Sequence, residues 1–411
     1  MTVSEPAPGQ PELVVETVEA DDLGPLLPLI DAREPLLFLR LGEGVAGIGE
    51  AVRLEFHGPT RMADAARAWH DLVAGARVTD PIGLPGSGLI AFGSFAFSEN
   101  SKATSVLIVP RVILGRRNGR SWITRIGDAA RPVATELGPE YRISLLPGAM
   151  DGEAFVAAVD ASLAAIAAGS VSKVVLARDL VGRLPEGADL RRVLGSLALG
   201  YPDCFTYAVN GLVGSSPETL VRVDHGTVSA RVLAGSTGRG ADADSDLDQA
   251  ISLATSTKDL DEHRYALASV MGALRPHASA ITASDLPFTL KLPNLWHLAS
   301  DVEGTLGDGS TSLDLVAAMH PTAAVAGTPT RAALSLIDEL EPFDRGRYAG
   351  PVGWVDAAGD GEWAVALRCA HVSSTGTVTA YAGAGIVSGS EPSTELAETK
   401  MKFRPIVEAF K

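Results

Sequence analysis

Short runs in which apolar and polar residues alternate recur along the chain, and this period of two predicts β-strands. The clearest signal is a hairpin, in which runs at 112–117 and 120–126 flank Asn118 and Gly119, a dipeptide typical of a two-residue turn. The other strands are expected within 36–56 and at 89–97, 104–110, 173–180, 204–213, 219–223, 228–233, 296–305, 352–356, 363–372 and 378–383.

Runs with a period near 3.6 predict helices. In residues 151–168 the side chains of Phe155, Val159, Leu163 and Ile166 form one apolar stripe. Near the C-terminus Ser390 is a candidate N-cap, and Pro392 suits a first helical turn, where its missing N–H group costs little. The other helices are expected at 62–76, 189–198, 245–274, 312–319 and 331–341.

The order of these elements predicts an α+β fold. Hairpins outnumber strand–helix–strand units, so we expect antiparallel sheets with helices packed outside them rather than a doubly wound parallel sheet. The sequence has no repeat of fixed period and no convincing linker in its middle. We expect residues 1–20 to be a disordered leader and residues 21–411 to form a single α+β domain.

The composition limits the classes of partner. The chain has 411 residues, 46% of them hydrophobic, which is ample for a large core. Its formal net charge of −16 argues against general nucleic-acid binding and against anionic membrane surfaces. If the substrate is an anion, the protein must supply local positive charge through a metal ion, arginine, lysine or backbone amides.

Several sequence features favour a cytoplasmic location. Cys204 and Cys369 are too few for a disulfide framework, which indicates a reducing compartment. The first residues are acidic and proline-rich, unlike a signal peptide, and no run is long and apolar enough for a membrane span. The absence of heptads and of long apolar edges favours a monomer.

The stretch 380–402 carries the strongest chemical pattern. Gly383 and Gly385 allow a ligand to approach bare backbone N–H groups. On the helix that follows, Glu395, Glu398 and Lys402 have the spacing i, i+3, i+7 and share one face. Together they suit a hard metal ion and an anionic ligand. For the glutamates and lysine alone, a solvated helix face is the commoner reading.

Other candidate residues are scattered, and each has a structural alternative. Lys173 opens a strand and Glu218 follows one, so an edge lysine and a turn carboxylate are the simpler readings. His297 is more typical of a hydrogen-bonded structural histidine than of a metal ligand. Residues 234–240 form a glycine-rich loop able to cup an anion. Arg368 lies in a strongly apolar strand, and a buried arginine needs an anion, so this residue favours a functional site most.

Taken together and in this order, the motifs resemble those of the chorismate-utilising enzymes, with the closest likeness to the isochorismate synthase branch. The resemblance covers residues 85–411, and the N-terminal part is only loosely similar. It is carried by Lys173–Arg178, Ser216-Pro-Glu218, Ala234-Gly-Ser236 with Arg239-Gly240, Lys258-Asp-x-x-Glu262-His263, His297-Leu-Ala-Ser300, His320-Pro-Thr-x-x-x-x-Gly-x-Pro329, Arg347-Tyr-Ala-Gly-Pro-Val-Gly-Trp354, Leu367-Arg-Cys-Ala370 and the stretch 382–402.

The resemblance implies one large domain with two antiparallel sheets in a sandwich, helices outside and the active site between the sheets. It implies that Glu262 and Glu398 hold Mg²⁺, with support from Glu395, and that chorismate is the substrate. One carboxylate of chorismate would bind the metal and the other Arg368. The remaining substrate contacts implied are Tyr348, Gly383, Gly385, Lys402, Gly235, Ser236 and His297.

The resemblance also implies the reaction. Lys173 as base would activate a water molecule that attacks ring C2, and Glu218 as acid would protonate the departing C4 hydroxyl, so that isochorismate forms. Lys173 favours water over ammonia as the nucleophile, since ammonia-using branches generally have glutamine there. Ala324 favours stopping at isochorismate, because lyase-competent branches tend to have threonine at this position. Salicylate synthase, which goes on to eliminate pyruvate, is the alternative. The sequence leaves three destinations open for the isochorismate: a catechol siderophore, menaquinone or another product.

Overall fold

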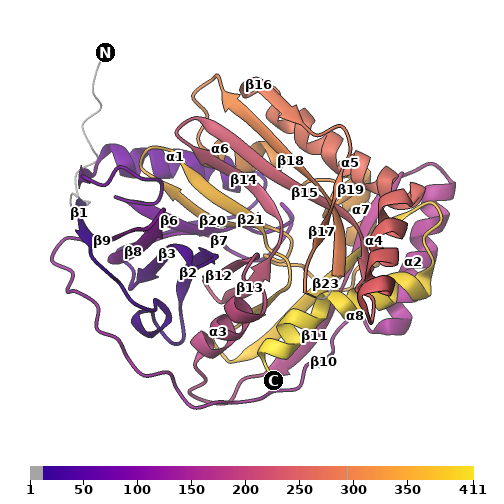
Figure 1. Cartoon of the computed structure of the whole chain (residues 1–411), viewed down its shortest axis with the longest axis horizontal. Helices are drawn as coiled ribbons and strands as arrows, with labels where there is room; N and C mark the ends of the chain where they lie inside the picture. Colours follow the sequence, from indigo (N-terminus) through magenta and orange to yellow (C-terminus); the bar gives the residue numbers. More distant parts are fainter. Residues whose placement is uncertain (1–12, 294) are drawn as a thin grey trace.

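Neighbouring residues of the strands face two different cores. The computed structural model describes residues 13–293 and 295–411. In strand β2 (Leu36–Arg40), Phe38 faces a large core between two sheets, whereas Leu37 faces a second core on the other side of its own sheet. Because side chains alternate along a strand, one sheet can pack against a second sheet on one face and against helices on the other. The described residues form two such sheets (Figure 1).

The larger sheet contains 13 of the described strands. Its order is β10 (Leu146–Pro147), β11 (Lys173–Arg183), β23 (Thr377–Val387), β22 (Cys369–Val372), β13 (Leu212–Ser216), β12 (Phe205–Val209), β2, β3 (Glu43–Ile48), β8 (Val112–Arg117), β9 (Arg120–Ile126), β1 (Val14–Ala20) and β5 (Arg77–Thr79), with β19 (Gly327–Thr328) beside β11.

The smaller sheet contains 10 of the described strands. Its order is β16 (Ala278–Ala283), β18 (Leu295–Leu306), β15 (Thr227–Gly238), β14 (Thr219–Asp224), β21 (Gly361–Val365), β20 (Pro351–Asp356), β6 (Ile90–Ser94), β7 (Ser105–Val109) and β4 (Val52–Phe56), with β17 (Phe288–Lys291) beside β18.

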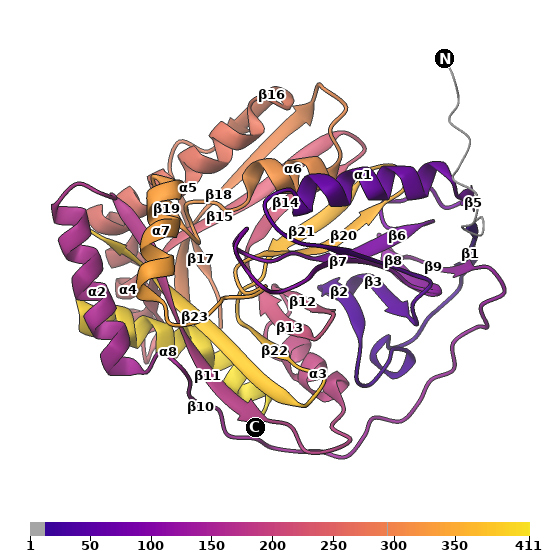
Figure 2. The same ribbon diagram turned by 180° about the vertical axis from the view of Figure 1, so that it is seen from behind.

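The helices lie mainly outside the two sheets, as Figure 2 shows for α1 and α6 above the smaller sheet. On the larger sheet, Leu197 of α3 and Phe403 of α8 pack in the second core. None of the described helices has the length and apolarity needed to cross a bilayer. Their bounds are α1 (Arg61–Ala74), α2 (Gly152–Ala167), α3 (Leu190–Gly200), α4 (Ala243–Thr255), α5 (Thr257–Leu274), α6 (Ser312–Met319), α7 (Thr330–Leu340) and α8 (Pro392–Ala409), with a 3₁₀ turn at Leu27–Leu29.

The predicted α+β sandwich is confirmed, and the hairpin around Asn118 and Gly119 has the predicted bounds. Among the described strands one pair, β1 with β5, is parallel. The leader expected over 1–20 is wrong for residues 14–20, which form β1 against β9. Val15 and Thr17 point inward there, an alternation that the sequence analysis did not use. Residues 1–12 of that expected leader lie outside the described residues.

Two predicted elements are divided in the structure. The helix expected over 245–274 breaks at Ser256, whose backbone is extended and whose hydroxyl accepts from the N–H of Asp259 to start α5. The strand expected over 363–372 divides into β21 of the smaller sheet and β22 of the larger sheet. Arg368 lies at this crossing with a φ angle of +47°, which ends the extended conformation.

The N-cap expected at Ser390 is wrong. Glu391 occupies that position in α8 and makes no side-chain cap, while the Ser390 hydroxyl accepts from the N–H of Val387 at 3.2 Å. Pro392 begins the helix as predicted. Strands β16 and β17 were not expected, because their residues lack a clear apolar alternation and are mostly half-buried or exposed.

Candidate active site

One cavity between the two sheets gathers nearly all of the residues nominated from the sequence. We call it the central cavity. Its walls come from β11 and β23 of the larger sheet, β15 and β18 of the smaller sheet, helices α5 and α8, and the loops at 324–325, 345–349 and 367–368. The predicted residues that line it are Glu218, Gly235, Ser236, Glu262, His297, Ala324, Tyr348, Arg368, Gly383, Gly385, Glu398 and Lys402. The exceptions are Lys173 and Glu395, which lie just behind the wall.

Lys173 is fully buried at the start of β11. Its Nζ lies 3.1 Å from Oε1 of Glu262, a residue of α5 that does line the cavity. This nitrogen makes no hydrogen bond of good geometry with any described residue, so the contact is an ion pair rather than an aligned hydrogen bond. The solvated edge lysine, which was the simpler reading of the sequence, is therefore wrong.

Glu218 follows β13 and turns into the cavity with only 5% of its surface exposed. Its backbone is held in place, because its N–H donates to the Ser216 hydroxyl and its carbonyl accepts from Val365. Burial raises the pKa of the Glu218 carboxyl to about 8, against the opposing charges of Lys173 and Lys402. At neutral pH this carboxyl therefore carries its proton and is able to act as an acid.

Three glutamates at one side of the cavity are each paired with a lysine. Lys173 pairs with Glu262, Lys402 contacts Glu398 on the same helix, and Lys258 lies 2.7 Å from the buried Glu395. Burial and the charge of Glu398 raise the pKa of Glu395. The pKa of Glu398 is lowered despite its burial, because Lys402 and the Ser236 hydroxyl bind its carboxylate. These pairs hold negative charge in a poorly solvated place.

A buried cation, Arg368, lies among the other cavity-lining residues. Its Nη2 donates to Nε2 of His297 at 3.1 Å, while Nδ1 of His297 lies 3.2 Å from the carbonyl of Gly235. Since a carbonyl only accepts, Nδ1 carries the proton and the imidazole is neutral. Burial and the charge of Arg368 lower the pKa of His297 well below its usual range, in agreement with that form. The arrangement aims a guanidinium into an enclosed space, where it would attract a carboxylate.

Gly383 and Gly385 of β23 allow neighbouring groups to approach the backbone closely, as the sequence suggested. A side chain at Gly385 would collide with the carboxylate of Glu262, and one at Gly383 would collide with the carbonyl of Leu176. The ammonium of Lys402 donates to the carbonyl of Gly383 at 3.0 Å. The β23 backbone therefore approaches the side chains of Glu262 and Lys402 without an intervening Cβ.

The family model described as "Chorismate binding enzyme" matches residues 133–411. The chain belongs to the chorismate-binding enzyme family. Isochorismate synthase DhbC of Bacillus subtilis is 41% identical over 286 residues, which are 67% of this chain and 71% of that protein. The salicylate biosynthesis isochorismate synthase of Pseudomonas aeruginosa is 30% identical over 97% of this chain and 90% of its own length.

A solved structure has the same fold. MenF, the menaquinone-specific isochorismate synthase from Escherichia coli, superposes with a TM-score of 0.79 over 99% of this chain and 97% of its own, at 22% identity. The family match begins at residue 133, whereas the resemblance expected from the motifs begins at 85. The fold likeness nonetheless extends across the N-terminal strands of this chorismate-binding enzyme.

Sequence reasoning missed a buried ion pair that supports the cavity of this family member. Arg345 lines the cavity, pairs with Glu341, and donates to the carbonyls of Val175 and Val325. Glu341 also accepts from the N–H of Ala177 on β11. The pair thus ties three wall segments together. Arg345 stands two residues before the motif that begins at Arg347, and its spacing of four from Glu341 was the available signal.

Tyr381 was also missed, although it stands inside the motif stretch of β23. It lines the cavity and stacks on Tyr348, with ring centroids 5.2 Å apart and planes 17° apart. A tyrosine among alanines and glycines is the one aromatic side chain of this stretch, and this contrast was a weak indication of a packing role. Its stacking fixes one side of the Tyr348 ring.

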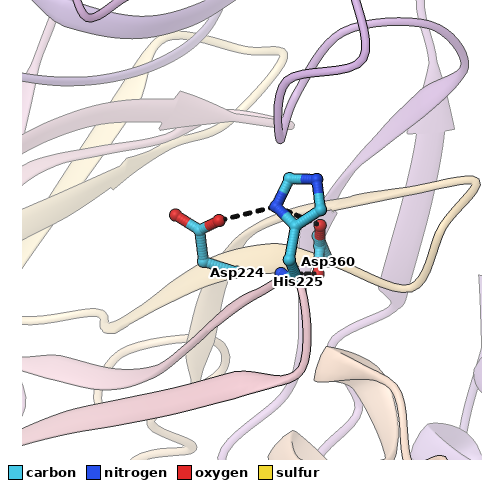
Figure 3. Close-up of side chains that lie close together, drawn as sticks. All are labelled: Asp224, His225 and Asp360. Atoms are coloured by element: carbon cyan, nitrogen blue, oxygen red, sulfur yellow. Dashed lines mark hydrogen bonds and ion pairs between the residues drawn. The ribbon is translucent and has the colours of Figure 1, made fainter.

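A second acidic cluster of this chorismate-binding enzyme lies away from the cavity. Asp224, His225 and Asp360 meet at the turn between β14 and β15 (Figure 3). Contacts within the turn already hold its two carboxylates: the backbone N–H of His225 donates to Asp360, Nδ1 of His225 lies 2.9 Å from Asp224, and Arg222 donates to Asp224. The cluster is explained as a turn-stabilising network.

Proposed function

We propose that this chain is an isochorismate synthase, which converts chorismate to isochorismate. One observation carries the proposal: an acid and an amine lie near each other at one enclosed cavity. Glu218 is buried and keeps its proton at neutral pH, and the buried Lys173 lies near enough to influence it. Membership of the chorismate-binding family and the relatives named isochorismate synthase support the choice of substrate and product.

Glu218 is the proposed general acid. The C4–O bond of chorismate breaks as the departing hydroxyl takes the Glu218 proton and leaves as water. This role requires a protonated carboxyl at working pH, and the raised pKa of Glu218, about 8, supplies it. Three nearby cations act to lower the pKa of Glu218: Lys173, Lys402 and Arg368. The pKa is nonetheless raised, because burial has a larger effect than these charges.

Lys173 is the proposed general base. It takes a proton from a water molecule as the oxygen of that water bonds to ring C2, and the ring double bonds shift toward C4. The net change is an isomerisation, because one water enters and one leaves. Lys173 is fully buried and lies near enough to act on the pKa of Glu218, which supports a placement of base and acid near the same ring. The role requires a neutral amine when the water attacks, so the ion pair of Lys173 with Glu262 would have to be released first.

The two carboxylates of chorismate suit the two ends of the cavity. We propose that the enolpyruvyl carboxylate binds Arg368, with Tyr348 and the backbone near Gly383 and Gly385. The ring carboxylate would lie toward Glu262 and Glu398, with Lys402 and the Gly235-Ser236 segment of β15 beside it. In this orientation the neutral His297 keeps the Arg368 guanidinium directed at the substrate.

Glu262 and Glu398 are proposed to hold Mg²⁺, with Glu395 in support. The donor set is all oxygen, which Mg²⁺ prefers, and Oε2 of Glu395 is buried with no hydrogen-bond partner among the described residues. Here each carboxylate contacts a lysine instead, and the three do not meet within 4.8 Å. A bound Mg²⁺ would supply positive charge to the ring carboxylate, and these ion pairs would have to rearrange around it.

Salicylate synthase is the alternative function. Ala324 lines the central cavity as predicted, and its methyl group leaves no hydroxyl where lyase-competent branches tend to have threonine. The relatives support the synthase without pyruvate elimination. We therefore assign the reaction that stops at isochorismate.

Purified protein incubated with chorismate and Mg²⁺ tests the assignment. We expect isochorismate, resolved by liquid chromatography, with no pyruvate in a lactate dehydrogenase-coupled assay. Stoichiometric pyruvate with fluorescent salicylate would establish the alternative function. Consumption of chorismate only when ammonia is supplied would overturn both.

A further inference from the structure

A second and larger cavity lies behind the loops that form the central cavity. It has a volume of about 900 Å³, and we call it the Arg347 cavity. Residues from the start of β2, the end of β11, the turn after β12 and the end of β22 line it, together with Arg347. None of the residues assigned to the proposed reaction lines it. A volume of this size suits a small organic molecule rather than a single ion.

Arg347 is a buried cation without a counter-ion. Its side chain belongs to a residue with 8% exposure, and its Nε and Nη1 are out of solvent contact with no hydrogen-bond partner among the described residues. No carboxylate of the described chain lies within ion-pair distance of it. Burial and the charge of Arg53 lower the pKa of Arg347 to about 10. A buried guanidinium without a partner is costly, so its presence needs an explanation.

Two further groups add positive potential or hydrogen-bonding capacity at the same cavity. Arg53 lies near enough for its charge to act on Arg347, although one of its nitrogens is 2.8 Å from Glu50. His371 of β22 also lines the cavity, and burial together with the charge of Arg347 lowers the pKa of His371 to about 4. At neutral pH His371 is therefore an uncharged hydrogen-bonding group near Arg347.

The acidic residues of this cavity do not neutralise Arg347. Glu50 is held by Arg53, and Asp31 accepts from the N–H groups of Arg33 and Glu34 in a local turn. Glu34 and Glu186 are exposed at the surface. The apolar part of the wall includes Leu36, Ile108, Leu184, Leu190 and Val372.

We propose that the Arg347 cavity binds a small organic anion, whose carboxylate or phosphate group lies against Arg347 and whose apolar part packs on the Leu36, Ile108 and Leu184 side. The anion would provide the counter-charge that the described chain does not. The apolar wall makes such a ligand fit better than an inorganic ion would.

The two cavities share two short segments of chain, in which different residues face each cavity. In the segment 345–348, Arg345 and Tyr348 line the central cavity and Arg347 lines the other. In the segment 368–371, Arg368 lines the central cavity and His371 lines the other. An anion bound at Arg347 would therefore fix the backbone from which the proposed chorismate contacts project.

Two brominated probes test the proposal: 4-bromobenzoate for a carboxylate and 4-bromophenyl phosphate for a phosphate. Crystals soaked with each probe locate it through the anomalous signal of bromine. Calorimetry then compares the full-length protein with Arg347→Met, which removes the charge at similar volume, and with Arg347→Lys, which restores it. We expect a bromine peak beside Arg347 and an affinity that falls at least ~10-fold in Arg347→Met and partly recovers in Arg347→Lys.

The probe that binds more tightly identifies the anionic group. Bromine density confined to the central cavity, no binding of either probe at millimolar concentration, or equal affinity in the wild type and Arg347→Met would overturn the proposal. Circular dichroism confirms beforehand that each variant folds. Isochorismate formation is assayed separately, so a failure here leaves the proposed function unaffected, and the reverse also holds.

Discussion

The central cavity and the Arg347 cavity each contain a buried arginine, but within the described part of the chain the arginine has a hydrogen-bond partner in the first and none in the second. At the central cavity Arg368 donates to His297, and three glutamates in or just behind its wall are each paired with a lysine. In the other, Arg347 has no partner among the described residues. The free volume of the central cavity is about 60 Å³, because long charged side chains fill it, whereas the second cavity holds about 900 Å³.

This comparison shows that volume is a poor guide to chemistry here. The smaller space is lined by Glu218, the proposed acid, and by Arg368, proposed to bind a carboxylate, and Lys173, the proposed base, lies just behind its wall. Such preorganised charges stabilise developing charge in a reaction without first having to reorient. The larger space has one strong feature, an uncompensated cation, which is suited to binding rather than to proton transfer.

Removing the proposed acid or base should have the largest effect. Lys173→Met fills the same space without an amine, and Glu218→Gln keeps the shape without a transferable proton. We expect each to lower kcat for isochorismate formation by at least ~100-fold, because proton transfer at C2 or C4 is lost. Steady-state assays of purified variants measure this.

Lys400→Ala is the matched control for that experiment. Lys400 lies exposed on α8, two residues before Lys402, so its removal should leave kcat unchanged. Near-normal turnover in Lys173→Met or Glu218→Gln, in protein with native circular dichroism, would reject the assigned roles and the contrast between the cavities.

We expect the activation by Mg²⁺ to depend on carboxylates of the central cavity and not on the second acidic cluster. Glu262→Gln and Glu398→Gln should each lower kcat/KM by about 100-fold at a fixed Mg²⁺ concentration, because each loses one anionic oxygen ligand. Calorimetric titration of chorismate with and without a chelator measures the metal contribution to binding. Asp360→Asn in the second acidic cluster is the control and should keep full Mg²⁺ activation. Loss of activation in that control would place the metal elsewhere.

The pH profile should show the protonated state of Glu218. Its pKa, about 8, is raised above the usual carboxyl range, so the acid form predominates below pH 8 and is lost as the pH rises through that value. We expect kcat/KM to fall above pH 8, approaching tenfold per pH unit. The residual activity of Glu218→Gln should lack this alkaline limb. An identical limb in the variant would assign it to another group.

Much of this site was predictable because its residues stand in distinctive motifs. Glu218, Arg368 and the glycines of β23 were named from the sequence, and the cavity brings them together. The placement of Lys173 behind Glu262 was not predictable, since it depends on how β11 packs against α5, far apart in sequence. The crossing at Arg368 was missed for a related reason. A continuous apolar run gives no sign that the chain passes from one sheet to another.

The Arg347 cavity could not be predicted from the sequence for the same reason, because it depends on how distant segments pack together. Arg347 was read as part of a motif that serves the chorismate site, because nothing in a linear string shows that Arg345 and Arg347 face opposite ways. Burial and partner choice are tertiary properties. They separate two arginines that composition and spacing treat as equivalent.

Stability measurements on these two arginines provide the finest test of the comparison. Arg345 is fully paired with Glu341 and bonded to two carbonyls, so Arg345→Met leaves a buried carboxylate uncompensated and should lower the free energy of unfolding by about 3–5 kcal/mol. Arg347→Met removes an unpartnered buried charge and should raise it by about 1–3 kcal/mol in buffer without organic anions. Urea unfolding followed by tryptophan fluorescence measures both. Because the residues are two positions apart on one loop, effects of opposite sign cannot arise from the loop itself.

A loss of stability in Arg347→Met would mean that its guanidinium is already compensated by the folded chain, and the contrast between the two cavities would then disappear.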